Sequence, residues 1–145
     1  MKKLYPLLSV LFLIYWGCED KETPPTEVTL WGEIYSIENT TELDLSGYDL
    51  TGSIPPEIGN LVNMTILRLD DNQLTGSFPP ELENLINLID INLSNNLLTG
   101  LLPDEICNLR ITSLFTPTLY RNKFCPPYPI CVENSVGYQD TSDCD

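Results

Sequence analysis

A gapless internal repeat, in which position 43 corresponds to positions 67 and 91, is the feature of this sequence that most constrains its fold. The stretch 43–45, Leu-Asp-Leu, recurs as Leu-Arg-Leu at 67–69 and Ile-Asn-Leu at 91–93. The Leu-Thr-Gly triplet at 50–52 recurs unchanged at 74–76 and 98–100. A fixed period of this size is typical of solenoids, in which each copy is one supersecondary unit that stacks on the next. We therefore expect a short stack of coils.

Each copy contains a stretch in which apolar and polar residues alternate. Such alternation indicates a half-buried strand. Because one coil cannot bury its own leucines, stacking brings these strands into a parallel sheet over a continuous core. The sequence thus predicts parallel strands at 43–46, 67–70 and 91–94, with Leu45, Leu69 and Leu93 buried in register.

Asparagine occurs at two fixed positions of the repeat. Asn72, Asn96 and Asn122 follow the predicted strands, where a buried amide can bond the backbone of adjacent coils. The first coil has Tyr48 there, so this ladder is expected to start at the second coil. A second ladder, on the convex side, is predicted for Asn60, Asn84 and Asn108.

Glycine and proline mark the second half of each coil. Gly52, Gly76 and Gly100 permit a tight path into a second short strand. The proline that follows each of them ends strand pairing and opens a helical turn.

This pattern resembles the plant-type leucine-rich repeat, LxxLxLxxNxLtGxIPxxIgNLxx, over residues 40–110. The resemblance implies an α/β solenoid, a right-handed superhelix with a parallel concave β-sheet and a 3-10 or irregular convex side. It also implies that the concave face binds peptides, proteins or glycans. A disulfide-stabilised C-terminal cap completes the predicted architecture.

Incomplete copies flank the three clear repeats. Residues 28–39 are predicted to form an N-terminal half-coil cap, in which Trp31, Ile34 and Ile37 shield the core. An aromatic binding patch is the alternative role for Trp31. Residues 111–145 form a degenerate fourth repeat and a Cys-rich cap, with two residues inserted near 110–113.

Four cysteines cluster at the C-terminal end of the chain, and together with the signal peptide predicted for residues 1–17 they indicate two disulfides. In the repeat frame Cys131 falls near Cys107 of the previous coil, which favours Cys107–Cys131 and Cys125–Cys144. Resemblance to the cap of plant repeat proteins implies the other pairing, Cys125–Cys131 with Cys107–Cys144. Both pairings remain open at this point.

The first residues have the features of an export signal. Lys2 and Lys3 precede an apolar run from Leu4 to Trp16, too short to span a bilayer as a helix. The following Gly-Cys resembles a bacterial lipobox, although Tyr15 and Trp16 depart from its usual residues. Residues 1–17 are therefore predicted to be a signal peptide, Cys18 the lipidated residue, and 18–27 a flexible tether. Ordinary secretion or an uncleaved anchor is the alternative.

Composition excludes several classes of function. With 7 basic and 21 acidic residues the formal charge is −14, which is incompatible with phosphate-driven binding of nucleic acid. Histidine is absent, so Ser/His/Asp triads and histidine-ligated metals are impossible. We find no phosphate loop and no EF-hand spacing. The chain is predicted not to be an enzyme and to need no cofactor or metal.

Binding through the concave face is the leading hypothesis. Outward positions of the strands should form columns across the coils, and the candidate contact residues are Asp44, Ser46, Arg68, Asp70, Asp71, Asn92, Ser94, Tyr120 and Arg121. The predicted function is that of an exported, lipid-anchored module at the cell envelope or surface that binds an extracellular protein, peptide or glycan. A structural or adhesion spacer is one alternative. A secreted eukaryotic inhibitor or receptor-like protein is another, and the sequons at Asn39, Asn63 and Asn92 would matter in that case.

Overall fold

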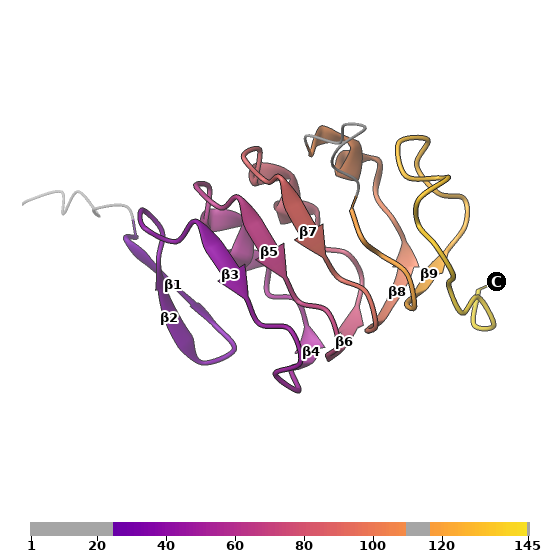
Figure 1. Cartoon of the computed structure of the whole chain (residues 1–145), viewed down its shortest axis with the longest axis horizontal. Helices are drawn as coiled ribbons and strands as arrows, with labels where there is room; N and C mark the ends of the chain where they lie inside the picture. Colours follow the sequence, from indigo (N-terminus) through magenta and orange to yellow (C-terminus); the bar gives the residue numbers. More distant parts are fainter. Residues whose placement is uncertain (1–24, 110–116, 145) are drawn as a thin grey trace, which may run out of the picture.

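The computed structural model describes residues 25–109 and 117–144 as a row of stacked coils (Figure 1). A hairpin at one end precedes two parallel sheets and a series of 3-10 helices. Its antiparallel strands are β1 (Glu27–Leu30) and β2 (Glu33–Ser36). The first parallel sheet contains β3 (Glu42–Asp44), β5 (Ile66–Arg68) and β7 (Asp90–Asn92). The second contains β4 (Thr51–Ser53), β6 (Gln73–Gly76), β8 (Leu97–Leu101) and β9 (Lys123–Cys125). The 3-10 helices are η1 (Pro56–Asn60), η2 (Pro80–Asn84) and η3 (Asp104–Asn108).

The three predicted parallel strands are confirmed, with shifted ends. Each begins one residue before the predicted stretch and ends two residues before its end. Their register advances by the repeat length, so that Leu43 lies beside Leu67 and Leu67 beside Ile91. Backbone bonds continue beyond the strand ends, for example from the Gly47 amide to the Asp70 carbonyl at 3.0 Å.

A single apolar core runs along the stack. Leu69 and Leu93 are fully buried, as predicted. Leu45 is only half-buried, because the first coil has no complete coil before it. The positive φ angles of Gly52, Gly76 and Gly100, between 78° and 80°, place these glycines in the left-handed region as the sequence required.

The asparagine ladder after the strands is confirmed. The Asn96 amide group donates to the Leu69 carbonyl of the previous coil at 2.8 Å and to the Leu93 carbonyl at 3.1 Å. Its oxygen accepts the Leu74 amide at 3.0 Å. Asn72 and Asn122 repeat this arrangement in their own coils. Each amide thus satisfies backbone groups that the turn would otherwise leave unpaired inside the core.

The predicted convex ladder is wrong. Asn60, Asn84 and Asn108 are exposed, and among the described contacts only Asn108 reaches another coil, at Glu83. The cross-coil amides on this side are instead Asn63, which donates to the Glu38 carbonyl, and Asn87, which donates to the Val62 carbonyl, both at 3.0 Å. These residues follow the 3-10 helices, where the preceding coil presents free carbonyls.

The N-terminal cap is an antiparallel hairpin and not the half coil that the sequence predicted. Trp31 and Gly32 both have positive φ, 47° and 89°, as the central residues of a tight hairpin turn do. Thr29 pairs with Ile34, and both side chains face away from the core, so Ile34 is 65% exposed. The shielding role predicted for Ile34 is therefore wrong. Val28 and Leu30 take it, with Trp31 and Ile37 packed against the core.

The C-terminal cap has the favoured disulfide pairing, Cys107–Cys131 and Cys125–Cys144. Arg68 pairs with Asn92, and Asn92 in turn pairs with Thr118. The second of these steps is longer than the first by the two extra residues that the sequence predicted. The insertion itself, near 110–113, lies outside the described residues, as do Cys18 and the segment 1–17.

Candidate functional site

The outward positions of β3, β5 and β7 lie in register along one face of the stack. We call this the β3–β5–β7 face, and it includes the continuation of the sheet into the fourth coil. One column contains Asp44, Arg68, Asn92 and Thr118. Adjacent strands of a sheet are about 4.8 Å apart, so these side chains form a closely spaced row that an extended ligand can follow.

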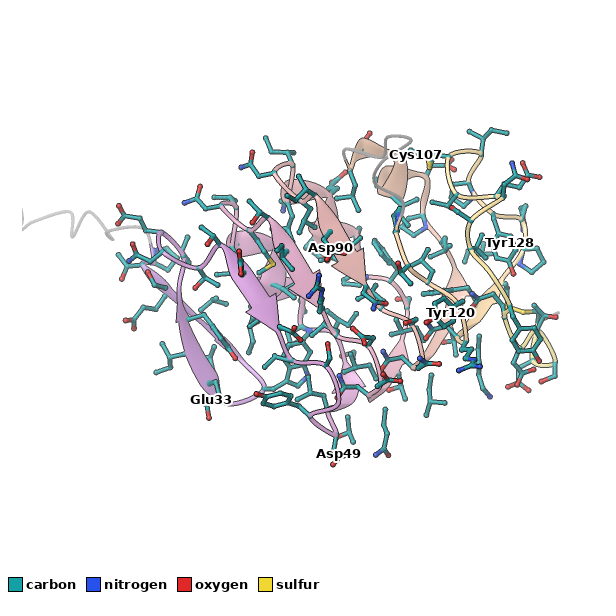
Figure 2. The ribbon with its side chains drawn as sticks, viewed as in Figure 1. Glu33, Asp49, Asp90, Cys107, Tyr120 and Tyr128 are labelled. Atoms are coloured by element: carbon teal, nitrogen blue, oxygen red, sulfur yellow. A yellow bond between two sulfur atoms is a disulfide. The ribbon has the colours of Figure 1, made fainter. Side chains whose placement is uncertain are left out.

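Ion pairs hold the middle of the β3–β5–β7 face. Arg68 donates to one oxygen of Asp90 from Nε at 3.0 Å and from Nη2 at 2.6 Å. The Asp44 carboxylate lies 3.9 Å from Nη1 of the same guanidinium. The hydrogen bond with Asp90 raises the pKa of Arg68 above its ordinary value. Figure 2 shows Asp90 near the middle of this face.

Asp90 was missed by sequence reasoning, although a signal for it existed. Strand side chains alternate, so the residue two positions before each member of the column also faces outward. Glu42, Ile66 and Asp90 occupy that second column and pair in register. The alternation that identified Asp44, Arg68 and Asn92 as outward-facing also predicts these three residues, each two positions earlier in its strand.

The first coils carry a concentrated negative charge at this face. The Ser46 hydroxyl lies 2.7 Å from Asp44 and 2.9 Å from Asp70, and thus joins the carboxylates of two coils. The side-chain and backbone hydrogen bonds of Ser46 lower the pKa of Asp44, with a smaller contribution from Arg68. Asp71 is exposed beside Asp70 at the rim.

Ser94 was predicted to be a contact residue, but it is buried, with 1% of its surface exposed. Its hydroxyl donates to Asn92 at 2.7 Å, as Ser46 does to Asp44. The small side chain occupies the position between the larger Asp70 and Tyr120 of the neighbouring coils. It therefore supports the face and offers no surface to a ligand.

The fourth coil gives the face a different character. Tyr120 is 41% exposed, and the guanidinium carbon of Arg121 lies 6.0 Å from the centre of its ring. Figure 2 places Tyr120 beyond β7, toward the C-terminal cap. Arg121 also donates from Nη1 to Asn95 at 3.3 Å. The face is acidic in its first coils and aromatic and cationic in its last.

Two residues of the C-terminal tail complete this end and were also missed. Gln139 continues the asparagine ladder: its amide group donates to the Leu119 carbonyl at 2.9 Å, and its oxygen accepts the Phe124 amide at 3.3 Å. Tyr138, 74% exposed, precedes it. The side-chain amide of Gln139 was the signal available in the sequence, but Gln139 lies closer to Asn122 than the repeat spacing requires.

Comparisons with known proteins agree with this geometry. The family model described as Leucine Rich Repeat matches residues 39–61, 63–85 and 87–109. No match was found among curated proteins. In the part of the chain that the structure describes, no helix is both long and apolar enough to cross a membrane.

Several solved structures of plant receptors are similar to the chain. The plant peptide hormone receptor RGFR1, in complex with RGF2, is 39% identical with a TM-score of 0.58, over 63% of this chain and 14% of that one. The Arabidopsis receptor kinase HAESA, in complex with the peptide hormone IDA and the co-receptor SERK1, is 30% identical with a TM-score of 0.58, over 67% and 16%. The BIR3–SERK2 complex from Arabidopsis thaliana is 28% identical with a TM-score of 0.56, over 67% and 53%. The chain thus spans less than a fifth of the length of the first two. Residues 39–109 of this protein are leucine-rich repeats.

Proposed function

We propose that this protein is an exported recognition module that binds an extracellular protein or peptide along its β3–β5–β7 face, which we take to be the concave face of a right-handed superhelix. The observation that carries the proposal is the in-register row of accessible side chains from four successive coils. Two of the similar plant receptors were solved with peptide hormones, which supports the same use of the repeats here. Two disulfides fit an oxidising, extracellular setting.

The proposed contact residues are those that remain accessible on this face. Asp44, Arg68, Asp71, Tyr120 and Arg121 are exposed, whereas Ser46, Asp70 and Asn92 are partly buried. The row offers carboxylates, an amide, a phenol and guanidinium groups, a mixture that suits a peptide with both backbone and side-chain groups to satisfy. A glycan would use the same face.

A matched pair of variants tests this function. Peptides selected from a displayed random library against the full chain should lose at least tenfold in affinity for Thr118→Arg, which places a long cation in the row. Thr75→Arg makes the same change on the second sheet, where Thr75 is exposed, and should bind within about twofold of the parent. If both variants bind alike, the β3–β5–β7 face is not the binding surface. A spacer protein would yield no selectable peptide at all.

Lipid anchoring at Cys18 is a separate part of the proposal, and it concerns residues outside the described ones. Cleavage before Cys18 and acylation of its thiol and amino group would attach two or three chains, enough for stable anchoring. The predicted tether ends earlier than residue 27, because the Thr26 carbonyl accepts the Ile37 amide and Glu27 begins β1. The polar residues 19–25 would then hold the module away from the bilayer.

Substitution of Cys18 should therefore release the protein. Cys18→Ala should move nearly all of it from the membrane fraction to the soluble exported fraction, since no acyl chain can then be attached. Mass spectrometry of the mature N-terminus gives the direct measurement. An unmodified residue near position 18, or an intact Met1, would contradict lipidation.

A further inference from the structure

Arg121 differs from the other cationic side chains in the described part of the chain. Residues 25–109 and 117–144 contain Arg68, Arg121 and Lys123. Arg68 is paired with Asp44 and Asp90, and Lys123 with Asp143. Among these described residues Arg121 has no carboxylate within ion-pair distance, although the chain as a whole has three times as many acidic as basic residues.

The backbone at Arg121 is held in a conformation that arginine rarely adopts. Its φ is 55°, in the left-handed region, where the equivalent positions of the first three coils have the tolerant residues Gly47, Asp71 and Asn95. The Arg121 amide donates to the Tyr138 carbonyl, and the Asn95 amide donates to the Tyr120 carbonyl at 3.1 Å. Non-glycine residues held in this region cluster at ligand-binding and active sites.

The guanidinium group of Arg121 is held in position, but most of its hydrogen-bond donors have no partner among the described residues. One Nη1–H goes to Asn95, and the Tyr120 ring lies beneath the group, yet a guanidinium carries five N–H donors. Tyr120 is 41% exposed, and Tyr138, whose carbonyl accepts the Arg121 amide, is the neighbour of Arg121 on the next segment of the sheet and is 74% exposed. Free donors, an unpaired positive charge and two hydroxyl groups are the chemistry that binds a tetrahedral or carboxylate anion.

We propose that Arg121, Tyr120 and Tyr138 form a subsite that selects a negatively charged group of the ligand. This rests on the proposed function of the β3–β5–β7 face. Asp44, Asp70 and Asp71 at the other end repel such a group, so the ligand lies with its anion at the fourth coil. Carboxylate, sulfate and phosphate share the required chemistry.

Three small probes that each carry one kind of anion distinguish these sources: N-acetylglycine, phenyl sulfate and phenyl phosphate. Each is titrated into the full chain labelled with ¹⁵N, and the backbone amide and Nε–H resonances of Arg121 are followed. At least one probe should give a saturable shift centred on residues 120, 121 and 138. If none saturates, the subsite does not exist.

Two substitutions use residues that the third coil already carries. Arg121→Asn copies Asn95, which adopts the same φ, so the variant should keep the fold. The dissociation constant of the probe that binds should rise at least tenfold. Lys123→Leu copies Leu97, removes one positive charge as well, and should change that constant by less than about threefold, because the Lys123 ammonium group is already paired with Asp143 at 3.2 Å. Equal effects of the two variants would mean that net charge alone is responsible, and would overturn the subsite.

The peptide ligands selected above separate the two proposals. If Thr118→Arg abolishes their binding and Arg121→Asn does not, the face binds ligands but the subsite is wrong. If the probes bind at Arg121 while Thr118→Arg leaves peptide binding unchanged, the subsite stands and the proposed function fails.

Discussion

Replacement of Leu69 by alanine should lower the free energy of unfolding by about 2–5 kcal/mol, the range for leucine truncation in a packed core. Leu69 is fully buried in the second coil, with a complete coil on one side and the hairpin-capped first coil on the other. The stack has no lateral element to move into the cavity, since each coil contacts chiefly its neighbours. Urea denaturation followed by circular dichroism measures the change.

Two further variants calibrate the result. Asp44→Ala, one residue before the half-buried Leu45 on the exposed side, should change stability by less than about 0.5 kcal/mol. Leu45→Ala should fall between the two, because Leu45 is only half-buried against the core. Equal losses from Leu69→Ala and Asp44→Ala would contradict the assignment of inward and outward faces.

The regular coils could be predicted because each position of the repeat has one physical role. A leucine that faces the core and an asparagine that bonds its neighbour's carbonyls are needed in every coil, so their spacing is visible in the sequence. The registers Leu43–Leu67–Ile91 and the amide bonds of Asn96 follow from that spacing. The disulfide Cys107–Cys131 could be predicted in the same way, because the repeat spacing brings both residues to adjacent coils.

The ends could not be predicted from periodicity, because the first and last coils have only one neighbour. Ile34 was assigned to the core by analogy with Ile58, but the hairpin turn at Trp31 and Gly32 reverses the chain and turns Ile34 to solvent. Gln139 lies outside the repeat spacing, and only its hydrogen bonds reveal that it continues the ladder. Burial of Ser94 depends on the size of its neighbours in the adjacent coils, which a one-dimensional pattern does not contain.

Reduction of both disulfides should unfold the fourth coil before the first three. Cys107–Cys131 fastens the tail to the third coil, and Cys125–Cys144 fastens β9 to the end of the chain. Each bridge is expected to contribute about 2–4 kcal/mol. Without them the cap is held by the few buried side chains of this end, Leu119, Phe124, Val132 and Val136, and by the amide of Gln139.

Hydrogen exchange with and without reductant resolves where protection is lost. The amides of Arg121, Phe124 and Asp140 bond to Tyr138, Gln139 and Asn122 within the cap, and they should exchange at least tenfold faster after reduction. The amides of Leu45 and Leu69 bond across the first three coils and should keep their protection. In a stack stabilised by nearest-neighbour contacts, loss at one end need not spread. Uniform loss from residue 45 to residue 124 would instead mean that the coils and the cap fold as one unit, and that a ligand-binding face in the first three coils depends on an intact cap.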